Sequence, residues 1–409
     1  MKPAKAAVKK PRGDRGESPS LMEPLLLAQA SPHRPALTDL ALTVAEKSSA
    51  FRYSLPPGIV AALADLVRAM NCYYSNLIEG HNTHPVDIER ALAGNYSTDA
   101  KKRGLQVEAA AHISVQRWID EGGLSARAVA VSSMREVHRR FCSQLPEDML
   151  WVEDDETHRR SKVVPGTFRE MDVRVGRRVP ISALSIPRFL ERFEEVYGPL
   201  GRTETILAAA AAHHRFLWIH PFLDGNGRVA RLLSHATFLQ TLDTAALWSV
   251  ARGLARRVDE YRGHLAACDE PRRGDLDGRG SRSEAALAEF TEFFLGACVD
   301  QIVFMRQLMQ PEELRPRVLA WAAEETAAKR LPARARDLMQ ALLYNGEISR
   351  GDVQAIVSGS ERTARRVVAA LADRGVIKAE SSRAPLKLAL PATLAERFLP
   401  GLFPSQPAR

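Results

Sequence analysis

The sequence has few cysteines and no long apolar run. Its four cysteines, Cys72, Cys142, Cys268 and Cys298, are scattered and show no C-x-x-C spacing. This predicts a reducing compartment, without a disulfide framework or a zinc site. No uninterrupted apolar stretch is long enough to cross a bilayer, and the N-terminal region lacks the apolar core of a signal peptide. We therefore expect a cytoplasmic protein with no membrane partner.

The charge balance is also unremarkable. The 409 residues carry a net charge of +8, from 57 basic and 49 acidic side chains. On a chain this long the bias is mild, compatible with a nucleic acid or an acidic partner but evidence for neither. The length suggests two or three domains.

The most informative stretch runs from His220 to Arg231 and reads HPFLDGNGRVAR. The apolar spacing predicts a helix over residues 205–219, which Pro221 should end, and a second helix over residues 227–239. The N-terminus of a helix favours an anion, and two arginines one turn apart would suit a polyphosphate.

Two simpler interpretations compete for this stretch. Gly225, Gly227 and Ala230 also satisfy the dinucleotide fingerprint G-x-G-x-x-G/A, but that fingerprint requires a strand before it, where we expect a helix. A plain structural loop with a helix cap would explain the glycines and Asp224, but not a histidine accompanied by two arginines.

The stretch resembles the signature of the Fic family, HxFx(D/E)GNGRxxR. All fixed positions match: His220, Phe222, Asp224, Gly225, Asn226, Gly227, Arg228 and Arg231. The resemblance implies a mainly α Fic-type helical core. It also implies a protein adenylyltransferase that moves AMP from ATP to a Tyr, Thr or Ser hydroxyl of a target protein or of itself, with Mg²⁺ as cofactor.

The resemblance also implies a role for each residue. His220 would be the base that deprotonates the hydroxyl, and Asp224 would bind the metal. The backbone of Gly225, Asn226 and Gly227 would form the anion hole, and Arg228 would hold the phosphates. Arg231 would hold the γ-phosphate or pair with an inhibitory glutamate.

A candidate for that glutamate lies upstream. Pro57 could open a helix that ends at Gly80. Glu79, directly before the glycine, would sit at the negative end of the helix dipole, which hints at a cationic partner elsewhere. Ser75 and Glu79 match the (S/T)xxxE(G/N) inhibitory motif of Fic proteins, so the resemblance implies an N-terminal inhibitory helix.

Two other segments bear on partners. Residues 163–176 alternate in a way that fits a short β-hairpin broken at Pro165–Gly166. They resemble the flap on which Fic proteins hold a target segment by strand-like pairing. Residues 1–20 are rich in lysine and arginine and have few large apolar side chains, which predicts a disordered basic tail.

The composition shifts after Pro311. Residues 333–409 show the pattern of a winged helix-turn-helix, with residues 360–371 as the recognition helix. Arg362, Arg365 and Arg366 would point away from its buried stripe. DNA binding and protein contacts are equally compatible with this pattern.

These observations divide the chain into a tail (1–20), a helical segment with the inhibitory motif (21–100), a catalytic core (101–310), a linker helix (311–332) and a winged helix-turn-helix (333–409). Two alternatives to adenylyl transfer stay open. Glu79 could orient a water that removes AMP from a modified protein, or the chain could be a DNA-binding regulator with a Fic sensor core. A homodimer is also left open.

Overall fold

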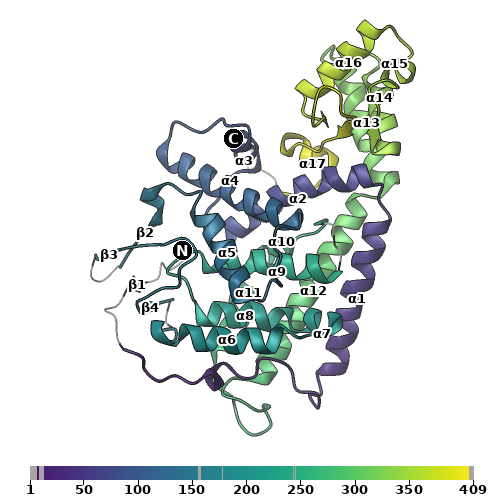
Figure 1. Cartoon of the computed structure of the whole chain (residues 1–409). Helices are drawn as coiled ribbons and strands as arrows, with labels where there is room; N and C mark the ends of the chain where they lie inside the picture. The colour runs from purple at the N-terminus through teal and green to yellow at the C-terminus, as the bar shows by residue number, and fades with distance from the viewer. Residues whose placement is uncertain are drawn as a thin grey trace.

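The computed structural model describes residues 13–154, 158–176, 178–242, 244 and 246–404, and the backbone of residues 7–8. Figure 1 shows a mainly helical molecule in which a large helical core carries a smaller lobe of late elements at one end. In the described part of the chain, none of the helices is both long and apolar enough for a membrane span.

Five helices come before the strand that begins at Trp151. They are α1 (Arg34–Tyr53), α2 (Pro57–Ile78), α3 (Pro85–Leu92), α4 (Ala100–Asp120) and α5 (Val131–Cys142). The expected start of α2 at Pro57 is confirmed, and Gly80 follows its end with a φ of +84°. A left-handed glycine just past the last turn is a common way to stop a helix.

The central helices surround the signature stretch. They are α6 (Ile186–Tyr197), α7 (Arg202–Leu207), α8 (Ala209–Ile219), α9 (Asn226–Leu242), α10 (Val250–Arg256), α11 (Val258–Asp269) and α12 (Glu284–Leu308). Helix α12 packs against α1, α8, α10 and α11. Its buried apolar residues extend along most of its length, because helices cover it on several sides.

The described strands before α6 form two small sheets. Strands β2 (Trp151–Glu153) and β3 (Arg160–Lys162) make an antiparallel hairpin, whereas β4 (Val173–Arg174) pairs with β1 (Ala7–Val8). The predicted small hairpin is therefore present, but its predicted bounds, residues 163–176, are wrong. The hairpin lies earlier, and the strand at Val173 pairs with a segment far away in the sequence, which local alternation cannot reveal.

The short 3₁₀ turns η1 (Pro19–Met22), η2 (Glu147–Leu150), η3 (Ala183–Ser185) and η4 (Ala392–Leu394) connect these elements. The first follows residues 13–18, which were predicted to belong to a disordered tail. That prediction is wrong from Gly13 onward, because Asp14 and Glu17 bind Arg188, Ser182 and Ser185 of the core. Residues 1–6 and 9–12 of the predicted tail lie outside the described residues.

The last lobe contains helices α13 (Pro311–Ala327), α14 (Ala335–Asn345), α15 (Val353–Ile356), α16 (Glu361–Asp373) and α17 (Ala395–Phe398). Strands β5 (Glu347–Ile348), β6 (Ile377–Lys378) and β7 (Leu386–Leu388) form an antiparallel sheet in the order β5-β7-β6. Buried Ala364, Val367 and Leu371 give α16 the apolar stripe that its sequence predicts.

This lobe rests directly on α2. Lys378 pairs with Asp65, and the backbones of Gly58 and Gly346 are so close that a Cβ on either glycine would collide with the other. Past α17, the Leu402 carbonyl accepts hydrogen bonds from Tyr74 Oη (2.9 Å) and Arg252 Nε (3.3 Å). The late chain therefore holds the helix that carries Ser75.

We expect the Tyr74→Phe variant to lose about 1 kcal/mol of unfolding free energy, the usual net value of one buried hydrogen bond. Arg252→Leu should lose more, because Arg252 also donates to Gly401 O (2.7 Å) and to Gln301 Oε1 (2.7 Å), and the buried Gln301 would lose this partner. Urea unfolding measures both, with Tyr53→Phe at an exposed tyrosine as the neutral control. A larger loss in Tyr74→Phe than in Arg252→Leu would contradict this account.

Candidate functional site

The signature stretch forms a helix, a tight loop and a second helix. Helix α8 ends at Ile219, and His220 adopts a left-handed backbone (φ 52°, ψ 61°) while its N–H still donates to Phe216 O (3.0 Å). Histidine is one of the few non-glycine residues enriched in this conformation. Because a helix and not a strand precedes the loop, the dinucleotide fingerprint lacks its required context.

A buried arginine fixes the backbone of His220. Arg169 donates from Nε to His220 O (2.8 Å), and its own N–H donates to Pro221 O (2.9 Å). Its two other nitrogens donate to Met171 O (2.9 Å) and Ile181 O (2.6 Å). Arg169 belongs to no local sequence motif, and its partners are backbone carbonyl groups. The sequence alone therefore did not indicate its role.

The imidazole of His220 is neutral at physiological pH. Burial lowers its pKa, and the positive charges of Arg178 and Arg169 lower it further, to about 3. A neutral imidazole accepts a proton, so the side chain is in the form that a general base requires.

Asn226 locks the turn between His220 and α9. Its Oδ1 accepts from Phe222 N (3.0 Å), and its Nδ2 donates to Phe222 O (2.8 Å). Phe222 is fully buried and stacks on the ring of His138, with the centroids 3.8 Å apart. The side chain of Asn226 thus shapes the loop, which leaves only its backbone for the predicted anion hole.

The first predicted arginine contact is present. Arg231 donates from Nε to Ser75 Oγ (2.8 Å) and from NH2 to Glu79 Oε1 (2.5 Å). Burial raises the pKa of Glu79, but Arg231 and Arg228 outweigh burial and leave the pKa lowered. The structure therefore brings together both residues of the predicted inhibitory motif with Arg231.

The Glu79 carboxylate also reaches the glycine turn. A Cβ added at Gly227 would lie 2.2 Å from Glu79 Oε1, so the carboxylate rests against the first turn of α9. The first N–H groups of a helix have no partner within the helix and attract negative charge. The carboxylate occupies the position in which a bound anion would be stabilised.

Arg228 has a carboxylate partner that the sequence analysis missed. Its NH1 donates to Glu108 Oε1 (2.5 Å), its NH2 lies 3.6 Å from Asp224 Oδ2, and its Nε is buried without a partner among the described residues. Burial raises the pKa of Glu108, but Arg228 and His81 outweigh it and hold the pKa at about 2. A glutamate next to the alanines of α4 was the one available signal.

Two further histidines serve the core. His213 contacts Ser234 Oγ (2.8 Å) and Tyr261 Oη (2.7 Å), and His214 contacts Asp269 Oδ1 (3.0 Å). The described residues contain no cluster of three or more metal-ligating side chains. Both histidines are buried polar residues of the core.

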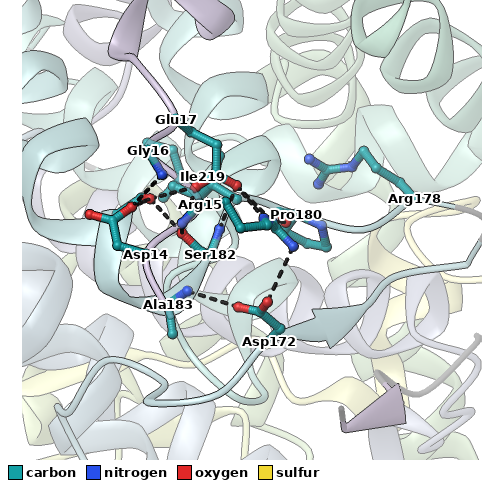
Figure 2. Close-up of polar contacts among 12 residues, drawn as sticks. Asp14, Arg15, Gly16, Glu17, Asp172, Arg178, Pro180, Ser182, Ala183 and Ile219 are labelled. Carbon is teal, nitrogen blue, oxygen red and sulfur yellow. Dashed lines mark hydrogen bonds and ion pairs between the residues drawn. The ribbon is translucent and has the colours of Figure 1, made fainter. Parts of the chain in front are cut away.

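Residues 14–17, just before η1, contact Asp172, which lies beside the arginine that holds the backbone of His220. Figure 2 shows Asp14, Arg15 and Glu17 lying across Asp172, Pro180 and Ser182. Arg15 pairs with Asp172 Oδ2 (3.2 Å), and the other oxygen of Asp172 lies 3.8 Å from Arg169. A short chain of charges thus connects residue 15 to the arginine that holds His220.

Part of this chain is similar to known proteins. Residues 129–238 match the model of the Fic/DOC family. The chain is 24% identical over 170 residues to the protein adenylyltransferases Fic of Drosophila erecta and Drosophila willistoni, covering 41% of this chain and 31% of each relative. The chain thus spans about a third of the length of these relatives.

The fold has a solved counterpart. A crystal structure of a Fic family protein from Desulfovibrio desulfuricans matches with a TM-score of 0.52 and 16% identity, covering 89% of this chain and 98% of that one. This likeness concerns the fold alone. Residues 129–238 thus resemble the Fic/DOC family, the mainly helical fold is that of a solved Fic protein, and the chain is distantly similar to protein adenylyltransferases.

Proposed function

We propose that this protein transfers AMP from ATP to a hydroxyl group of a target protein or of itself, and that Glu79 restrains the reaction. The observation that carries the proposal is the position of the Glu79 carboxylate. It lies on Arg231 and against Gly227, at the start of α9, where an anion would be held.

The chemistry needs a base and a phosphate site on either side of one loop. The hydroxyl oxygen attacks the α-phosphorus, and its proton passes to the neutral imidazole of His220. The bond from the α-phosphorus to the bridging oxygen breaks, and pyrophosphate leaves. The N–H groups at Gly225, Asn226 and Gly227, together with Arg228, stabilise the charge that develops.

The residues present fit a magnesium ion. The Asp224 side chain is 56% exposed, next to the turn formed by residues 225–227. Its Oδ1 accepts a hydrogen bond from the neighbouring Gly225 N–H (2.7 Å). Mg²⁺ is commonly held by one or two carboxylates together with phosphate oxygens and water. Asp224 would hold the ion, which would neutralise charge on the phosphates of ATP.

The two glutamates at the arginines take different roles. The Glu79 side chain is 27% exposed at the end of a helix, whereas that of Glu108 is 3% exposed within α4. An unpaired carboxylate buried as deeply as Glu108 would be costly, so it stays with Arg228 and fixes the direction of that side chain. Glu79 can leave Arg231 for water, which is what a removable inhibitor requires.

The target would dock on residues 163–176. Strand β4 lies in this segment and begins four residues after Arg169, which holds the backbone of His220. An extended peptide paired with β4 would be aligned with the base by main-chain hydrogen bonds, with little demand on its sequence.

The same geometry also suits the reverse reaction. A carboxylate close to the anion turn can orient a water molecule, so Glu79 would then help to remove AMP from a modified protein. The two directions separate in one variant, because loss of Glu79 should speed transfer but abolish removal.

A second function is supported by the last lobe. Its order of helix, strand, helix, helix, strand and strand is the order of a winged helix-turn-helix, and Arg362, Arg365 and Arg366 are exposed on α16. Arg365 pairs with Glu361, while Arg362 and Arg366 have no ion pair among the described residues. Two such arginines are available for the phosphates of a DNA duplex.

Replacing His220 by asparagine should lower AMP transfer by roughly 10²–10⁴-fold, the usual contribution of a positioned base. Asparagine tolerates the left-handed backbone, so folding and ATP binding should persist. Initial rates with labelled ATP measure the effect, and thermal unfolding is the control. Transfer near the wild-type rate would show that His220 is not the base.

Glu79→Gly should raise AMP transfer at least about tenfold, because a phosphate misplaced by about 1 Å can cost roughly 10²-fold in rate. Ser75→Ala should activate more weakly, since Ser75 only supports Arg231. Glu79→Gln is the matched control: it keeps the shape but removes the charge, so activation by it would assign the inhibition to electrostatics. Equal rates in wild type and Glu79→Gly would remove the inhibitory role. If Glu79→Gly with Arg231→Ala stays as active as Glu79→Gly, Arg231 is not the group that Glu79 withholds.

If the last lobe binds DNA, duplex affinity should fall steeply with salt, because each phosphate contact releases counterions. Replacing Arg362, Arg365 and Arg366 by glutamate in the full chain should abolish binding in a low-salt mobility-shift titration. Charge reversal at Arg334 and Arg336, outside α16, is the control. Wild-type affinity after reversal of the three α16 arginines would leave protein contacts as the role of the lobe.

A further inference from the structure

The edge of β4 already has an occupant within this chain. Strand β1 (Ala7–Val8) runs antiparallel to β4, with Ala7 opposite Arg174 and Val8 opposite Val173. Since an extended peptide on this edge would make the same main-chain hydrogen bonds, β1 takes the place that the proposed function gives to the target.

A set of polar contacts anchors the segment that follows β1. Arg188 donates to both carboxylate oxygens of Asp14 (2.6 and 2.7 Å), and Glu17 accepts from Ser182 N (2.9 Å) and Ser185 Oγ (2.6 Å). Hydrogen bonds from Arg188 and Gly16 lower the pKa of Asp14, so its carboxylate stays charged at neutral pH. Figure 2 shows Asp14 and Glu17 in this anchor.

The anchor also reaches buried groups. Arg15 donates to Pro180 O (2.6 Å) and pairs with Asp172, which is 1% exposed and accepts from Ala183 N (3.0 Å). Charged hydrogen bonds to a buried carboxylate are among the stronger ones in proteins. Residues 14–17 therefore form a firm attachment point, whereas the pairing of β1 with β4 covers two residues on each strand in the described part of the chain.

The short β1–β4 pairing, next to the firm attachment at residues 14–17, can be displaced. Four residues separate Val8 from Gly13 in the sequence, and tethering at so short a separation gives an effective concentration of about millimolar order. Two paired residues alone would hold poorly in solution, but this concentration keeps the edge occupied for much of the time. A target peptide that pairs over a longer stretch would displace β1.

The occupant cannot itself accept AMP through a hydroxyl. Residues 1–17 contain no serine, threonine or tyrosine, and Ser18 is the first such residue in the chain. Ser18 lies beyond the anchor, at the start of η1. A strand on the docking edge that lacks an acceptor competes with a substrate without being one.

We propose that the segment around β1 is a tethered pseudosubstrate, which covers the target-docking edge of β4 until an extended, hydroxyl-bearing peptide displaces it. This rests on the proposed function for the role of the edge, but the presence of the segment there is independent of catalysis. It adds a second restraint, because Glu79 acts on the phosphate site and the pseudosubstrate acts on the target.

A designed disulfide tests the pairing without any activity measurement. Facing residues of an antiparallel pair have Cα atoms roughly 4.5–5.5 Å apart, which suits a disulfide. The full-length double variant Ala7→Cys with Arg174→Cys should cross-link rapidly under mild oxidation. The native cysteines Cys72, Cys142, Cys268 and Cys298 are all buried and should not react.

Maleimide counting in denaturant reports the result, as two fewer free thiols than in the reduced protein. The matched control is Gly13→Cys with Arg174→Cys, because Gly13 lies at the anchor with nothing close to its Cβ position. Faster cross-linking of the Ala7 pair supports the pairing. Equal or slower cross-linking than in the control would overturn the proposal.

The second part uses the same variant in a Glu79→Gly background. The oxidised protein should lose most of its AMP transfer to lysate proteins, and reductant should restore it. Deleting residues 1–12 should raise transfer by about twofold to tenfold, as expected when a half-occupied or mostly occupied edge becomes free.

The outcomes separate the two proposals. A cross-linked protein that transfers AMP at the reduced rate would overturn the pseudosubstrate role. If reduced Glu79→Gly shows no transfer at all, the proposed function fails, while the cross-linking comparison still decides whether the segment occupies β4.

Discussion

The site depends on the pairing of two α9 arginines with two carboxylates from other helices. Arg231 meets Glu79 from the end of α2, and Arg228 meets Glu108 from the middle of α4. Buried cations at the start of a helix need such partners, because desolvation costs several kcal/mol per charge. The difference in exposure between the carboxylates then separates a removable partner from a permanent one. Under the proposed function, the same electrostatic requirement would both build the phosphate site and regulate access to it.

The loop that carries His220 depends on a second buried charge, the guanidinium of Arg169. Arg169 satisfies carbonyl groups on both sides of His220, and Asp172 lies close to its guanidinium. Residues 14–17 attach to this same group through Arg15. The geometry of the base thus depends on segments more than 150 positions apart in the sequence, and it places the occupant of β4 close to the reaction that we propose.

The last lobe extends this dependence to helix α2, which carries Ser75 and precedes Glu79. Its backbone touches the start of α2 at Gly58, and residues 401–402 accept hydrogen bonds from Tyr74 and Arg252. Tyr74 directly precedes Ser75, the residue that supports Arg231. A partner that engages the lobe would therefore act on a helix that contacts the phosphate site.

What the sequence by itself determined was local. The stop at Pro221, the glycine turn, the two arginines on one face of α9 and the end of α2 at Gly80 all follow from backbone chemistry and helical spacing, and the signature residues cluster as their spacing implied. Only the tertiary structure decided which groups meet across the chain. The partners Glu108 and Arg169 were missed, and the hairpin and part of the tail were misplaced, because long-range pairing leaves no periodic trace in the segments that take part. Hydrophobic spacing encodes which face of a helix is buried, but the identity of a charged partner depends on how the helices pack.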